Sequence, residues 1–326
     1  MIISRTPLRI SLGGGGTDLP SFYRQNGPGF LIAAAINKYV YVAVHENFES
    51  KYLLKYSEIE NVPQLSEIKH PMIRAAFAHL GVEPGVEVTS IADIPAGTGL
   101  GSSGSFAVGL LNAAAQYMGR SVENEWLAST AADLEINVLN EPVGKQDQYI
   151  AAFGGLTAFE FNGDETVAVE KVNMHPSDRH DLEHSLMLFF TGIRRSASDE
   201  LRVIANSSPG RSNRVRENLD EVRNAGYEAL KVLESGDVEK FGALLTNQWR
   251  LKLARQPSRV HDEIDAAIEA GIRAGAFGGK LIGAGGGGFL LFAASNRRAV
   301  RKAMSGQGLV EVPIAFDQVG ATTVTA

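Results

Sequence analysis

Three glycine-rich segments contain the residues from which chemistry can be inferred, and the strongest covers residues 95–105. Its sequence is PAGTGLGSSGS, and it precedes a small, apolar stretch at 106–118 that is typical of a buried helix. Glycines allow the backbone to approach an anion, successive N–H groups can point into one concavity, and a helix amino terminus adds positive potential. The hydroxyls of Ser102, Ser103 and Ser105 can contact a phosphate oxygen or magnesium. This order predicts a triphosphate-binding loop.

Two better-known nucleotide-binding patterns fit less well. A Walker A loop requires Gly-Lys followed by Ser or Thr, whereas Gly279-Lys280 is followed by leucine. The spacing GxGxxG occurs at 99–104 and again at 283–288, but a dinucleotide fingerprint also requires an acidic residue about 20 residues later, at the end of a second strand. Here that position falls at 119–125, between two expected helices. A dehydrogenase is therefore a weak alternative.

The composition excludes several other classes of protein. The chain has 326 residues, of which 44% are hydrophobic, a net charge of -6 and no cysteine. Its length predicts two domains, and the absence of cysteine excludes disulfides and thiolate metal sites. The balanced charge argues against nucleic acid as a partner. No apolar run reaches the roughly 18 residues of a membrane span, and the amino terminus lacks a signal-peptide core, so we expect a cytoplasmic protein that binds no membrane.

Hydrophobic periodicity predicts alternating strands and helices that would position the glycine segments. We expect a first domain at 1–165 and a second at 166–326. A polar connection is expected at 175–184. The expected strands cover 30–46, 87–91, 154–161, 185–192 and 288–294. The expected helices cover 106–118, 123–139, 198–206, 211–234, 237–252 and 258–274.

The glycine segments also carry a family resemblance. PLRISLGGGGTD near the start, PAGTGLGSSGS near residue 100 and KLIGAGGGGF near residue 285 resemble the three motifs of the GHMP kinases, in the same order. Within that superfamily the chain is most similar to bacterial D-glycero-D-manno-heptose 7-phosphate kinases, through RTPLRISLGGGGTDLPSFY, GKQDQYIAAFGG, FTGIRRSAS and WRLKLA. The resemblance implies an α+β, two-domain fold. Its amino-terminal domain would be like ribosomal protein S5 domain 2, its carboxyl-terminal domain would be ferredoxin-like, and the active site would lie between them.

The resemblance implies a phosphoryl-transfer site with ATP and Mg²⁺. Asp147 would accept or orient the proton of the attacking hydroxyl, and Arg9 would keep Asp147 ionised and steady the transferring charge. Ser103 and Glu135 would hold magnesium, with Glu141 as the alternative ligand. The residues expected to bind ATP are Pro95, Gly97, Gly99, Leu100, Gly101, Ser102, Ser103, Gly104 and Ser105.

Residues on the acceptor side are implied in the same way. Those expected to contact the sugar phosphate are Gly14, Gly15, Thr17, Asp18, Arg194, Arg195, Lys252, Gly285 and Gly286. Simpler roles stay open, because Thr17 and Asp18 could cap a helix and the basic residues could form surface ion pairs. Asp147 and Glu135 could likewise be a capping aspartate and a solvated glutamate.

The resemblance therefore implies a kinase that phosphorylates the anomeric hydroxyl of a heptose 7-phosphate. Another GHMP sugar kinase, of the fucokinase or galactokinase type, and a non-catalytic sugar or nucleotide sensor are the alternatives. The expected partners are small molecules, and a homodimer is compatible with the sequence. His180 and His184 lie four residues apart, but no third ligand accompanies them as a catalytic zinc site requires.

Overall fold

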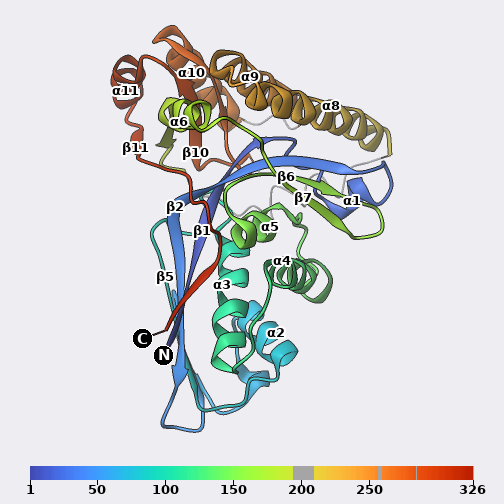
Figure 1. Ribbon diagram of the computed structural model, residues 1–326, viewed down its shortest axis with the longest axis vertical. Helices are drawn as coiled ribbons and strands as arrows, with labels where there is room; N and C mark the ends of the chain where they lie inside the picture. Colours follow the sequence, from blue (N-terminus) through green and yellow to red (C-terminus); the bar gives the residue numbers. More distant parts are fainter. Residues whose placement is uncertain (194–208, 256–258, 284, 326) are drawn as a thin grey trace.

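The computed structural model describes residues 1–193, 209–255, 259–283 and 285–325, and their strands form two sheets (Figure 1). In the larger sheet the order is β12-β1-β2-β5-β3-β4, and β6 pairs with both β2 and β7. Its strands are β1 (Ile2–Gly13), β2 (Gly29–Glu46), β3 (Tyr52–Lys55), β4 (Ile59–Val62), β5 (Val86–Ala92), β6 (Leu156–Phe161), β7 (Val167–Lys171) and β12 (Thr322–Thr325).

The long strand β2 organises this sheet. It pairs with β1 on one edge, while β6 and then β5 occupy the other edge. The register shifts where Pro7 faces Tyr39 and Leu8 faces Ile36, so two residues of β2 are left out of the ladder. Such a bulge increases the local bend and twist of a strand. One continuous strand thereby pairs with β6 before the bulge and with β5 after it.

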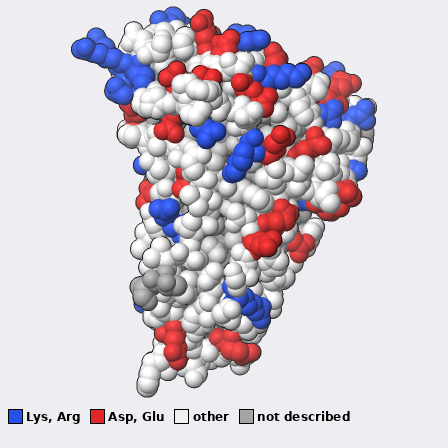
Figure 2. Space-filling model, in the orientation of Figure 1, with Lys and Arg blue, Asp and Glu red and all other residues white. Residues whose placement is uncertain are grey.

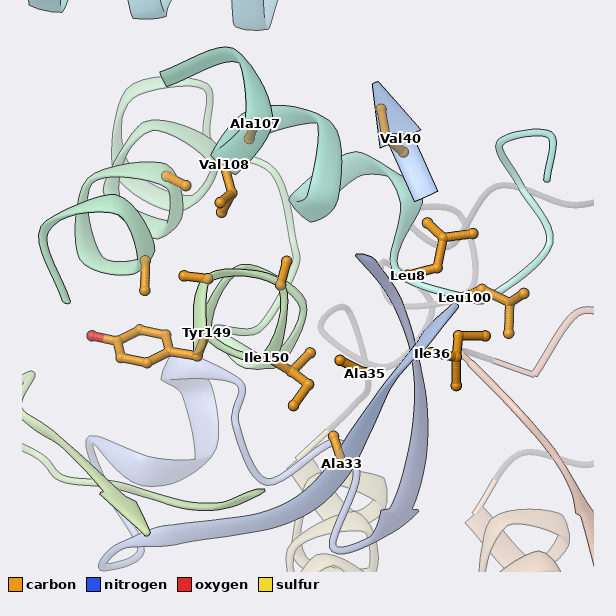
Figure 3. Packing of buried hydrophobic residues seen from close by; sticks show 14 of the residues in the cluster. Leu8, Ala33, Ala35, Ile36, Val40, Leu100, Ala107, Val108, Tyr149 and Ile150 are labelled. Carbon is orange, nitrogen blue, oxygen red and sulfur yellow. The ribbon is translucent and has the colours of Figure 1, made fainter. Parts of the chain in front are cut away.

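Helices cover one face of the large sheet (Figure 1). They are α2 (Pro71–Leu80), α3 (Ser102–Tyr117), α4 (Asn124–Asp133) and α5 (Gln146–Phe153). The α3 helix is rich in small residues and packs closely on β1 and β2. Figure 3 shows Ala107 and Val108 of α3 together with Tyr149 and Ile150 of α5 in the buried cluster. The helix expected at 123–139 is α4 followed by a π-helical turn, Leu134–Val138.

The smaller sheet has the order β11-β8-β10-β9 and is antiparallel throughout. In chain order this places the fourth strand beside the first, then the third and the second, an arrangement expected of a ferredoxin-like unit. Its strands are β8 (Leu186–Phe190), β9 (Ala276–Leu281), β10 (Phe289–Ala294) and β11 (Val310–Val312). The accompanying helices are α6 (Pro176–Ser185), α8 (Pro209–Glu234), α9 (Val238–Arg255), α10 (Arg259–Arg273) and α11 (Arg297–Ser305). The α+β prediction is confirmed.

One expected connection is a helix. The polar stretch 175–184 forms most of α6, where His175 caps the first turn by accepting from the Ser177 amide and Pro176 takes the first position. Proline suits that position because its missing N–H would have no partner there. The helix expected at 198–206 lies outside the described residues. The boundary near residue 165 stays a prediction; the first sheet also contains β7 and β12 from beyond it.

The two sheets meet where α8 and α9 pack against the large sheet (Figure 1). Phe30 of β2 stacks on Tyr227 of α8 with ring centroids 4.1 Å apart, and the Gln248 amide of α9 donates to the Leu12 carbonyl at 3.0 Å. These contacts place the ends of β1 and α9 at the junction. No helix in the described part of the chain is long and apolar enough to cross a bilayer. On the face in Figure 2, basic and acidic side chains of the described residues are interspersed.

Candidate active site

A pocket opens at this junction and takes residues from both sheets. Arg9, Ser103 and Asp147 line one part, while α9 and β9 contribute Lys252 and Lys280. The described lining residues are Arg9, Ser11, Gly15, Gly16, Asp18, Leu19, Ser103, Val143, Gly144, Gln146, Asp147, Leu219, Val222, Gln248, Trp249, Lys252, Arg255, Lys280, Leu281 and Gly283. The three sequence motifs and GKQDQY therefore converge, although they are far apart along the chain.

The pair Arg9–Asp147 lies between the glycine loop and the pocket. Both Nε and Nη2 of Arg9 donate to Oδ1 of Asp147, at 2.7 and 2.6 Å. The Nη1 atom donates to the Gly99 carbonyl, and the Arg9 amide donates to the Leu100 carbonyl at 3.0 Å. Arg9 is buried, whereas Asp147 keeps 23% of its side chain exposed. The arginine thus fixes one carboxylate oxygen and leaves Asp147 accessible to a ligand.

The predicted triphosphate loop leads directly into α3. Gly97, Gly99 and Gly101 all have φ near +80°, a conformation that other residues rarely adopt. Gly101 precedes the first helical residue, Ser102, and Gly104 packs against Asp147. Strand, loop and helix therefore follow in the predicted order, with a helix amino terminus beside the Arg9–Asp147 pair.

Individual residues of the loop occupy different environments. Ser103 lines the pocket, while Pro95 and Gly97 are exposed beside it. Leu100 is buried in the core, and Ser105 is buried with its hydroxyl donating to the Pro7 carbonyl at 2.8 Å. The structure therefore uses Leu100 and Ser105 to hold the loop on the sheet.

The turn predicted to contact the acceptor is centred on Asp18. Its carboxylate accepts from the Gly16 amide at 3.0 Å and from the Gln146 amide and side chain at 3.1–3.2 Å. Burial, with a smaller contribution from the Asp147 charge, raises the pKa of Asp18. Asp18 makes no cap for the short helix α1 (Pro20–Tyr23), whose cap residue is Leu19. A buried carboxylate beside Asp147 is consistent with binding of a hydroxylated ligand.

The neighbours of Asp18 have structural roles. Thr17 is fully buried, and its hydroxyl lies 2.8 Å from the Gly14 and Phe30 carbonyls and accepts from the Phe30 amide. Neither Thr17 nor Gly14 lines the pocket, but Gly15 does. A Cβ on Gly144 would lie 1.9 Å from Oδ2 of Asp18, so glycine is required there for the carboxylate to reach Gln146.

Glu135 and Ser103 form a suitable site for a magnesium ion. Glu135 is buried on the π-helical turn, accepts from the Gln148 side chain and is hydrogen-bonded by Ser103. Burial raises the pKa of Glu135 to about 7. The Asp147 charge acts in the same direction, and the two hydrogen bonds act against it. A buried carboxylate is costly unless a cation accompanies it. Carboxylate and hydroxyl oxygens are also the ligands that Mg²⁺ prefers, so the residues present fit this ion.

Lys280 is a site residue that sequence analysis did not assign. It is buried on β9, and its ammonium donates to Oε1 of Gln248 at 2.9 Å. Burial, reinforced by the Arg9 charge, lowers the pKa of Lys280 to about 7. A lysine inside the otherwise apolar strand AFGGKL was the available signal, because buried lysines are rare without a partner.

The remaining predicted acceptor residues are distributed differently. Lys252 lines the pocket and donates to the Gly283 carbonyl. Gly285 lies behind Lys252, with its carbonyl 2.9 Å from His261, and neither it nor Gly286 lines the pocket. Arg194 and Arg195 lie outside the described residues. The described histidines, including the pair 180 and 184, form no metal cluster within the described ranges.

Two glycine segments meet at the wall of the pocket, where Gly283 lies. A Cβ on Gly283 would lie 2.6 Å from Cα of Gly99, and a Cβ on Gly288 would lie 2.1 Å from the Thr98 carbonyl oxygen. The third motif therefore supports the second through close backbone contact. In the described lining, cationic side chains outnumber carboxylates, which suits an anionic reactant. The class of protein that this fold and site define is a phosphotransferase.

Comparisons with known proteins identify the family. The GHMP kinases N terminal domain matches residues 67–155 and the GHMP kinases C terminal domain matches residues 229–308, together more than half of the chain. The chain belongs to the GHMP kinases, as the motifs predicted. Its relatives further support a sugar kinase, a phosphotransferase that acts on a sugar hydroxyl and uses ATP as a substrate.

Two sequence relatives and two solved structures illustrate the similarity. D-glycero-alpha-D-manno-heptose 7-phosphate kinase of Campylobacter jejuni is 29% identical over 306 residues, which are 89% of this chain and 88% of the relative. L-fucokinase/L-fucose-1-P guanylyltransferase of Bacteroides fragilis is 24% identical across 92% of this chain and 35% of its own. The crystal structure of a D-glycero-D-manno-heptose 1-phosphate kinase from Bacteroides thetaiotaomicron has a TM-score of 0.81 at 25% identity, covering 100% and 99% of the two chains. A mevalonate kinase structure shares the fold, with a TM-score of 0.72 at 19% identity over 96% and 98%.

Proposed function

We propose that this kinase transfers the γ-phosphate of ATP to the anomeric hydroxyl of D-glycero-D-manno-heptose 7-phosphate, giving the 1,7-bisphosphate. The observation that carries the proposal is the Arg9–Asp147 pair, held between the glycine loop and the acceptor turn of Asp18. The heptose-phosphate kinases among its relatives support this choice of acceptor.

The carboxylate of Asp147 orients the attacking hydroxyl and accepts its proton. One of its oxygens is held by Arg9, which leaves the other for the acceptor. Phosphoryl transfer depends mainly on alignment and on cations near the phosphate oxygens. Arg9 and Lys280 supply positive charge from the two sides of the junction. The two cations are near enough that the Arg9 charge contributes to the lowered pKa of Lys280.

The acceptor is held by groups around Asp18. Gln146 and the Gly16 amide fix the Asp18 carboxylate, so its remaining acceptor capacity is directed toward sugar hydroxyls. Hydrogen bonds made by a fixed, buried group discriminate strongly between ligands with and without a matching hydroxyl. Gly15 is open on its side-chain face and leaves space beside this carboxylate.

Ser103 and Glu135 would hold Mg²⁺ together with the phosphates of ATP. When bound, the ion neutralises charge on the phosphate oxygens. Gln148 positions Glu135 by donating to its carboxylate, and the π-helical turn directs that carboxylate toward the amino terminus of α3. The ligand set is small, as is usual for magnesium sites completed by substrate phosphates.

ATP consumption by the purified protein with magnesium tests the proposal. The acceptors to compare are D-glycero-D-manno-heptose 7-phosphate, the unphosphorylated heptose, galactose and fucose. We expect turnover with the 7-phosphate only, and a loss of at least about 100-fold in kcat for Asp147→Asn, because general-base and orienting roles contribute about 10²–10⁴-fold. Asp181→Asn is the matched control, since Asp181 is exposed on α6. Equal turnover of a free hexose would refute the heptose assignment while leaving the kinase class intact.

A further inference from the structure

A cation with no assigned role lies at the end of α9. Arg255 lines the pocket and donates from Nη1 to Oδ1 of Asn218 at 3.2 Å. Its Nε is buried and, among the described residues, has no hydrogen-bond partner. Burial lowers the pKa of Arg255 from 12.5 to about 10, and within the described part of the chain no carboxylate opposes this effect. A guanidinium stays charged under physiological conditions, so the pocket contains a positive charge that no carboxylate of the described residues neutralises.

The surroundings of Arg255 place it on the acceptor side of the pocket. A Cβ on Gly16 would lie 3.7 Å from Nη2 of Arg255 and 3.4 Å from Leu219. The Gly16 amide in turn donates to Asp18 at 3.0 Å. Arg255 therefore borders the turn that carries Asp18.

One edge of the guanidinium makes no hydrogen bond with the described residues. Oδ1 of Asn218 accepts the hydrogen bond from Nη1 of Arg255, while the side-chain amide of Asn218 donates to the Leu251 carbonyl at 2.9 Å. Asn218 is therefore fixed by α9 and fixes Arg255 from α8. The opposite edge presents Nε and Nη2, the two N–H groups that bind a phosphate or carboxylate side by side.

We propose that Arg255 binds the phosphate that the acceptor already carries, with Asn218 as its positioning residue. This inference rests on the proposed function, because it concerns the substrate of the same site. Asp18 binds sugar hydroxyls and Arg255 binds the phosphate ester beyond them, so the acceptor is held at two points while its anomeric hydroxyl faces Asp147. Arg255 then selects phosphorylated sugars over free sugars.

The variants Arg255→Ala and Arg255→Lys test this role, with Arg250→Ala as the matched control. Arg250 is exposed on the same helix and does not line the pocket. With saturating ATP and magnesium, Arg255→Ala should raise the KM for heptose 7-phosphate by about 10- to 100-fold, the range for losing charged hydrogen bonds. The KM for ATP of the same variant should stay within about threefold, and Arg250→Ala should leave the KM for heptose 7-phosphate unchanged. Arg255→Lys should fall between, because lysine keeps the charge but lacks the fork.

Inorganic phosphate provides a second readout that requires no turnover. It should bind the wild-type protein and Arg250→Ala, measured by calorimetry, and bind Arg255→Ala at least about 10-fold more weakly. If the wild-type protein phosphorylates no heptose, the proposed function fails, and the phosphate titration still decides whether Arg255 is an anion site. Unchanged phosphate binding in Arg255→Ala, or an equal rise in its KM for ATP and its KM for heptose 7-phosphate, would overturn the proposal.

Discussion

Replacing Lys280 with methionine should make the unliganded protein more stable and the enzyme slower. Burial lowers the pKa of Lys280 from 10.5 to about 7, and each pH unit of pKa change corresponds to about 1.4 kcal/mol, so retaining the charged ammonium costs roughly 5 kcal/mol below pH 7. Methionine removes this cost but leaves Oε1 of Gln248 without its donor, a loss of about 1–3 kcal/mol. The balance favours the variant by roughly 2–4 kcal/mol at pH 6.5.

The pH dependence of this gain has a definite sign. The folded protein has the lower pKa, so between pH 7 and 10.5 the unfolded chain binds more protons and the stability of the wild-type protein rises with pH. The advantage of Lys280→Met should therefore disappear near pH 9.5. In activity assays, the lost cation should reduce kcat by about 100-fold, as removal of a group that stabilises transition-state charge does.

Urea unfolding at pH 6.5 and pH 9.5, without nucleotide, measures the stability change. Lys240→Met is the control for the change in side-chain type, because Lys240 is exposed on α9, the helix that packs on β9. A variant less stable than wild type at pH 6.5, or an advantage equal at both pH values, would show that the ammonium is not the destabilising group. ATP with magnesium should stabilise the wild-type protein more than Lys280→Met, because only the former gains a partner for its charge.

Two further predictions concern the metal and acceptor sites. Because the pKa of Glu135 is raised from 4.5 to about 7, wild-type stability should fall as pH rises across that range, and Glu135→Gln should remove this loss in metal-free urea unfolding while increasing the magnesium concentration needed for activity. Gly144→Ala places a Cβ against Asp18 and should raise the acceptor KM at least about 10-fold in steady-state assays, whereas Gly163→Ala, with only ordinary contacts, should leave it unchanged.

Each of these predictions has a contrary result. An equal pH dependence for Glu135→Gln and wild type would mean that another group titrates in that range. An unchanged acceptor KM in Gly144→Ala would mean that Asp18 can move without loss of binding.

The glycine segments and regular elements were predictable because their signals are local. A β-branched run specifies β2, and small apolar residues after a glycine loop specify α3. These features depend on spacing and backbone geometry within one segment. By contrast, α5, whose first turn contains Asp147, was not among the expected helices.

Residues whose roles depend on long-range packing were harder to predict. Gln248 reaches Leu12 across 236 positions, and this contact helps bring Lys280 to the pocket. Arg255 gave no distinctive signal, since basic residues are favoured in the last turn of any helix. Hydroxyls presented the opposite problem: Thr17 and Ser105 resemble ligands in sequence, but their partners are backbone groups. Residue type alone does not identify a hydrogen-bond partner.

The contact between the loops at 98–99 and 283–288 restricts how this enzyme can diverge. A side chain on Gly99, Gly283 or Gly288 would meet the backbone of the facing segment at 3.0 Å or less. A larger residue at any of these glycines would therefore require the backbone of the opposite loop to move. Engineering of nucleotide preference should therefore treat the two loops as one unit and exchange them together, since a loop grafted alone would bring a shape that its opposite backbone cannot accommodate.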